Sequence, residues 1–151
     1  MACLLSIVHM SCQMAVSMLT RRSRSRRMIR TMCEDDFREP TSGEQAMLMK
    51  LLERPFPGRD ALLTQVPRCR VRTLHQDGTF EIYVAGGLEA GNVNQRVPVE
   101  VRDADDDGVP VDILLHVVNG RLAELEIVKL DGSPIRKTLD PNKWQPVVRS
   151  P

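Results

Sequence analysis

The segment 109–129, VPVDILLHVVNGRLAELEIVK, decides the fold of this 151-residue chain. Two apolar runs flank the dipeptide Asn119-Gly120, which suits the positive φ angles of a type I′ turn. A two-residue turn also fixes the register of the strands that it joins. The segment therefore predicts a tight β-hairpin, in which His116 lies opposite Ala123.

Strict alternation in this register assigns each side chain of the hairpin to one of two faces. The first face carries Leu114, Val118, Ala123, Leu125 and Ile127. The second face carries Val111, Ile113, Leu115, Val117, Leu122 and Val128, together with Glu124 and Glu126. Because both faces are largely apolar, we expect the hairpin to lie in the centre of a sheet.

Upstream of the hairpin, helical signals come first and strand signals follow. Thr41 and Glu44 have the spacing of a capping box, and an apolar stripe at helical spacing follows them until Pro55. A shorter helix is predicted over residues 59–65. From residue 68 the apolar period changes to two, which predicts strands over 68–74, 79–84 and 97–101, and a short last strand near 135–137.

These elements predict the α+β class, with one or two N-terminal helices packed on a mainly antiparallel sheet of about five to six strands. The predicted domain spans residues 38–151. Within it we expect Cys69 to be a small buried apolar group, and Trp144 to pack back onto the sheet.

Residues 1–37 differ from the rest of the chain in charge. The first 33 residues contain six arginines and no acidic residue, and all 20 acidic residues lie downstream. The apolar stretch precedes its arginines, which reverses the order found in a secretory signal. We interpret this segment as a disordered or mis-started extension, with Met28 or Met32 as an alternative start. A membrane anchor and an organelle-targeting segment are the other interpretations.

Motifs and charge narrow the functional classes for the predicted domain. The cysteines lack C-x-x-C spacing, and neither a glycine-rich phosphate loop nor a nucleophile elbow occurs, so we expect no metal and no cofactor. The domain has an excess of acidic residues and no interleaved aromatic residues, so we expect no specific nucleic acid as a partner. We also expect no membrane association of the domain, and a reducing, cytoplasmic location.

A calcium loop is matched only in its first half. Asp103, Asp105, Asp107 and Gly108 fit the D-x-D-x-D-G pattern, but Leu114 stands where a bidentate glutamate is required. The flanking segments are predicted strands, whereas the calcium loop needs helices. We therefore expect a solvated acidic turn.

Six residues are candidates for a functional site: His116, Glu124, Glu126, Arg68, Arg70 and Arg72. His116 could act as a general base if Asp112, on the same strand face, held its tautomer, although a partly buried structural histidine is the simpler interpretation. The two glutamates could form a binding surface, act as acid and base, or pair with the three arginines across the sheet. We favour the charge pairing.

The sequence LLHVVNGRLAELEI (114–127) also carries a resemblance, together with DGSPI (131–135) and FPGR (56–59). With these motifs, roughly residues 38–145 resemble a family of small bacterial domains of unknown function. The resemblance implies a compact helix-then-sheet domain of bacterial origin, and it brings no activity or catalytic residue to this chain.

We therefore expect a non-enzymatic interaction module that binds another protein through a face or an edge of its sheet. The alternative is a small hydrolase- or lyase-like enzyme that uses His116 with a carboxylate. Nucleic-acid binding rests on the N-terminal arginines alone. The sequence makes no prediction of oligomeric state.

Overall fold

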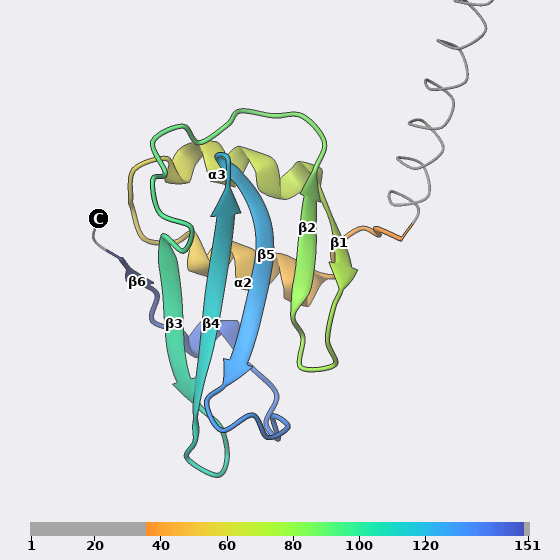
Figure 1. Cartoon of the computed structure of the whole chain (residues 1–151), viewed down its shortest axis with the longest axis vertical. Helices are drawn as coiled ribbons and strands as arrows, with labels where there is room; N and C mark the ends of the chain where they lie inside the picture. The colour runs from red at the N-terminus through yellow and green to blue at the C-terminus, as the bar shows by residue number, and fades with distance from the viewer. Residues whose placement is uncertain (1–35, 150–151) are drawn as a thin grey trace, which may run out of the picture. The chain divides into compact units, whose positions relative to one another are not determined.

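The computed structural model describes residues 36–149, in which two short helices lie behind a six-stranded antiparallel sheet (Figure 1). The helices are α2 (Ser42–Leu51) and α3 (Arg59–Gln65), and the 3-10 turn η1 (Val66–Arg68) follows them. The strands are β1 (Cys69–Thr73), β2 (Phe80–Val84), β3 (Val99–Ala104), β4 (Pro110–Val118), β5 (Arg121–Lys129) and β6 (Val147–Val148), with the 3-10 turn η2 (Pro141–Lys143) before β6. The α+β class is confirmed. The interpretations of the basic N-terminal segment concern residues outside this range, apart from Asp36 and Phe37.

The strand order is β1-β2-β5-β4-β3-β6, so the β4–β5 hairpin is central, as predicted. The predicted last strand near 135–137 is wrong. The backbone N–H groups of Arg136 and Lys137 donate to the Asp105 carboxylate and therefore make no strand ladder there. Instead β6 is the edge strand next to β3, where Val147 pairs with Glu100.

The predicted register of the central hairpin is wrong from His116 onward. His116 pairs with Glu124, and Leu114 pairs with Glu126. Ala123 is left as the extra residue of a β-bulge, which interrupts the alternation of side chains along β5.

The physical reason for the bulge is the spacing of two core leucines. Leu122 and Leu125 are three residues apart, so regular alternation would bury only one of them. With the bulge, both are buried. Consequently Glu124 and Glu126 lie on the face of His116, and their predicted place among the core residues of β4 is wrong.

The core lies between the helices and the sheet. The capping box of Thr41 and Glu44 starts α2, as predicted, and the helices contribute the buried Leu48, Leu51 and Leu62. Trp144 and Cys69 are also buried, as predicted. Burial raises the pKa of the Cys69 thiol to about 11.

Phe37 belongs to the packed domain, because it is 8% exposed and its ring lies 5.7 Å from that of Tyr83. Packing therefore starts one residue before the predicted boundary. In the described part of the chain, neither helix has the length and hydrophobicity that a membrane crossing requires.

The buried Gln65 ties the central hairpin to the long loop 85–98 that crosses above it. Its amide N–H groups donate to the carbonyls of Leu88 and Gly120 at 2.7 and 2.9 Å, and its carbonyl oxygen accepts from the Leu122 N–H at 2.9 Å. All three partners are backbone groups, so one side chain fixes both the turn and the loop.

Candidate functional site: the open face of the sheet

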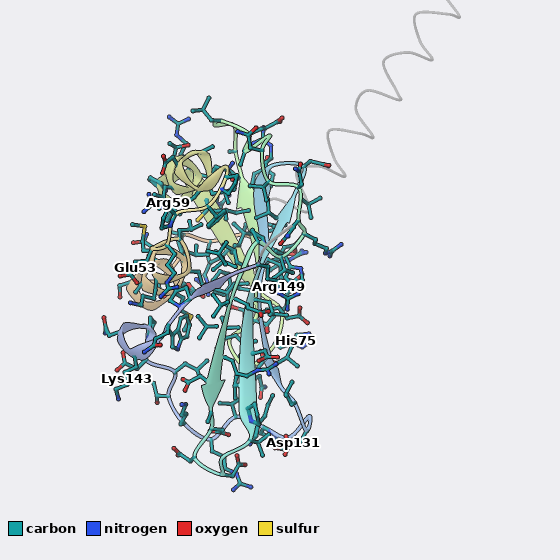
Figure 2. All side chains as sticks on the ribbon, turned by 90° about the vertical axis from the view of Figure 1, so that its left-hand side faces the viewer. Glu53, Arg59, His75, Asp131, Lys143 and Arg149 are labelled. Atoms are coloured by element: carbon teal, nitrogen blue, oxygen red, sulfur yellow. The ribbon has the colours of Figure 1, made fainter. Side chains whose placement is uncertain are left out.

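The sheet face opposite the helices is the candidate site, and we call it the open face. In Figure 2, Glu53 and Arg59 mark the helical side, and His75 lies on the other side of the sheet. Of the described elements, both helices pack on the far side, while Phe37 covers the part of the open face next to Tyr83. The central part carries Glu81, Leu114, His116, Glu124, Glu126 and Val128, all of intermediate exposure.

His116 is held between two charged side chains. Its Nε2 lies 2.7 Å from Glu126 Oε2, and Arg96 Nε donates to its Nδ1 at 3.3 Å. A guanidinium can only donate, so Nδ1 accepts and we assign the ring proton to Nε2. The predicted partner Asp112 binds Arg102 instead, at 2.7 and 2.9 Å. Both ring nitrogens of His116 are therefore engaged.

The arginines lie at the far edge of the sheet from His116. Arg72 is in β1, and its Nε donates to Glu81 of β2 at 3.1 Å. Arg70 donates to the Phe37 carbonyl, and Arg68 lies in η1 rather than in the predicted strand. Since β2 separates β1 from β5, the observed cross-strand ion pair joins Arg72 to Glu81 and does not reach Glu124.

Glu124 occupies an unusual position in the middle of the open face. It lies directly opposite Glu81 on one side and His116 on the other. Among residues 36–149 its carboxylate has neither a hydrogen bond nor an ion pair. Arg72 pairs with Glu81, so of these two facing carboxylates only Glu124 is left without a cation among the described residues.

A cleft of about 510 Å³ adjoins Glu124, where the turn 75–79 and the loop 132–135 face β5. Its lining includes Asp77, Glu124, Glu126, Val128, Ser133 and Pro134. Carboxylates therefore meet apolar walls in one depression at the border of the open face.

The acidic turn 103–108 is not simply solvated, as the sequence analysis expected. The Asp105 side chain is fully buried, and Lys129 Nζ lies 2.7 Å from Asp105 and 2.6 Å from Asp107. The Lys129 ammonium holds the pKa of the Asp105 carboxyl well below its usual range. Lys129 thus pairs with two carboxylates of the loop, and the sequence signal for this was a lysine at a core-facing position of β5.

In the described range no group of three or more histidine, cysteine or carboxylate side chains is placed to hold a metal ion. The Cys69 thiol is buried and stays protonated at neutral pH, because its pKa is about 11. The remaining functional groups are half-exposed carboxylates beside apolar side chains.

These observations define a two-layer α+β domain with two helices on one face of an antiparallel sheet and a charged open face. The chain belongs to the family described as domain of unknown function (DUF6984), whose model matches residues 37–139. The resemblance to a family of uncharacterised domains is thereby confirmed. Searches among curated proteins and among solved structures find no match to the chain.

Proposed function

We propose that this domain is an interaction module that binds another protein through the open face of its sheet. The observation that carries the proposal is Glu124, a half-exposed carboxylate with no cation partner among the described residues. Leu114 and Val128 lie on the same face, next to Glu126, and are incompletely buried. Apolar surface next to an unpaired charge favours a protein partner that covers both.

The alternative of a hydrolase- or lyase-like enzyme has less support. A general base needs a ring nitrogen within reach of the substrate proton. In His116, Glu126 and Arg96 engage both nitrogens, and the side chain is only 11% exposed.

We also propose a cytoplasmic location in a bacterium. The bacterial origin rests on the motifs of residues 114–127 and 131–135. The location is supported by Cys69, a buried free thiol in the described domain, since a reducing compartment keeps such thiols unpaired.

Site-specific photo-crosslinking in the source organism tests the interaction. A benzophenone side chain at position 114 should yield a defined adduct, whereas the same probe at the exposed Met49 on α2 should not. The adduct at position 114 should disappear when Glu124 is changed to lysine. Equal adducts from both probes, or an adduct unaffected by Glu124→Lys, would contradict binding through the open face.

A further inference from the structure

The cleft beside Glu124 exists because β2 and β5 separate early. Only two residue pairs join these strands, Phe80 with Leu125 and Glu81 with Glu124. Below them, the Thr79 hydroxyl accepts from the Ile127 N–H at 2.9 Å and takes the place of a backbone ladder bond. The turn 75–79 therefore diverges from β5 and leaves a notch open to solvent.

The lysine of the cleft does not neutralise its carboxylates. Lys129 contributes to the lining, but its ammonium is bound to Asp105 and Asp107 and is 2% exposed. Glu126 uses one oxygen for His116. The Glu124 carboxylate has no partner in the described range, whereas the facing Glu81 is paired with Arg72. A cation from outside would supply the partner that Glu124 lacks.

The walls of the cleft fit a long cationic side chain rather than a bare ion. Val128, Pro134 and Ile135 line it with apolar atoms, which suit the methylene stem of such a side chain. Its head would meet Glu124 and Glu126, two carboxylates on one face of β5. A planar guanidinium with five N–H donors can bridge two carboxylates, whereas an ammonium is a point charge.

The loop wall of the cleft is also held in place before any ligand arrives. The Asp105 carboxylate accepts from the backbone N–H groups of Arg136 and Lys137, both at 2.9 Å, and from the Lys129 ammonium at 2.7 Å. These bonds tie the loop after β5 to the turn between β3 and β4. A preformed site loses less conformational freedom on binding.

We infer that this cleft receives an arginine side chain presented by a segment of a partner protein. The inference rests on the proposed function and names the partner's chemistry: a guanidinium against Glu124 and Glu126, with apolar residues flanking the arginine against Leu114 and Val128.

Titration of the ¹⁵N-labelled full chain with N-acetyl-arginine amide tests the inference by NMR. Amide signals of residues 124–128 and of Ser133 should shift and saturate. The citrulline analogue, which is nearly isosteric but neutral, should cause no saturable shift, and the lysine analogue should bind several-fold more weakly. Glu124→Gln should weaken arginine binding at least fivefold. Glu53→Gln, which removes one carboxylate on the helical side, should leave it unchanged.

Three outcomes would overturn the inference: no saturable shift with arginine, equal shifts with citrulline or lysine, or parental affinity of Glu124→Gln with its spectrum otherwise intact. The result is independent of the crosslinking experiment. A partner crosslinked at position 114 without arginine binding would support the interaction module and contradict the arginine site. Arginine binding without a crosslinked partner would support the cleft as an arginine site and contradict binding of a partner protein through the open face.

Discussion

Gly120 shows how one residue joins two distant parts of the chain. Its φ of 69° is the left-handed conformation that the Asn-Gly turn requires, and Asn119 has φ 51°. Its carbonyl accepts from the Ala90 N–H at 2.8 Å, and a Cβ added to it would lie 2.8 Å from that same nitrogen. Gly120 therefore meets a conformational and a steric requirement at once.

We expect Gly120→Ala to lower the free energy of unfolding by more than about 1 kcal/mol, because it adds strain at positive φ to a contact with backbone that cannot move aside. Gly86→Ala is the matched control, since Gly86 has φ 72° but nothing within 4 Å of the added Cβ. Urea unfolding should therefore show a larger loss for Gly120 than for Gly86. Equal losses would mean that the loop 85–98 does not pack on the turn.

At the residue scale, the sequence predicted what depends on near neighbours. The Asn-Gly turn, the Thr41 cap and the burial of Cys69 follow from local pattern and are confirmed. The engagement of His116 by Arg96 was not predictable, because the two residues come from separate segments that meet only in the folded sheet.

The bulge at Ala123 is the feature of the central hairpin that determines which residues reach the open face. Removing Ala123 would leave Leu122, Leu125 and Ile127 in perfect alternation with the two glutamates, and every observed pair with β4 would be retained. We expect the deletion to change the free energy of unfolding by less than about 1 kcal/mol. Chemical denaturation with the parent alongside measures this.

Deletion of Glu126 is the informative comparison. It would turn Ile127 to the open face and pull Lys129 away from Asp105, because a one-residue shift reverses every later side chain. This variant should lose its cooperative transition. If the two deletions lower the free energy of unfolding equally, Ala123 is not the extra residue of a bulge and the register described above is wrong.

At the element scale, the helices and hairpins were predictable and the bulge was missed. The three-residue interval between Leu122 and Leu125 was visible in the sequence, yet an unbroken alternation was assumed across it. That assumption placed Glu124 and Glu126 among the core residues of β4, whereas the bulge places them on the open face with His116.

For the whole molecule, carboxylates with lowered pKa values make stability depend on pH, and Asp105 and Glu44 are lowered most. Lys129 holds the pKa of Asp105 below its usual range, and Arg38 lowers that of Glu44 to about 2 from an ordinary 4.5. The unfolded chain therefore binds protons more readily at these groups. Their contribution to stability is complete above the unfolded pKa of each and is lost as pH falls from about 4.5 towards 2.

We expect the urea midpoint to fall steeply between pH 5 and pH 2.5. Asp105→Asn should be less stable at pH 7 and show a shallower fall, while Asp60→Asn, at a 90% exposed carboxyl, should follow the parent. If the urea midpoint of Asp105→Asn falls with pH as steeply as that of the parent, the Asp105–Lys129 pair does not contribute to the loss of stability in acid.

The arrangement of strands was the least predictable property of the molecule. Strands β4 and β5 pair through a local turn, and that pair was predicted. The pairing of β2 with β5 depends on contacts across the whole intervening meander, and β6 consists of two residues with no alternation to detect. The α+β fold class could be predicted from the sequence, whereas the residues that lie next to Glu124 in the sheet could not.

The narrow junction between β2 and β5 also sets an order of assembly. Strands β3, β4 and β5 can associate by closing short loops, whereas the β1–β2 hairpin must find β5 across a long intervening chain and gains two backbone pairs and the Thr79 hydroxyl for it. Loop closure of this kind is entropically slow. We therefore expect the β1–β2 hairpin to dock last during refolding. In pulsed hydrogen exchange, the amide of Ile127, which donates to the Thr79 hydroxyl, should gain protection after that of Ile113, which lies between β3 and β5. Simultaneous protection would mean that the junction forms within the nucleus.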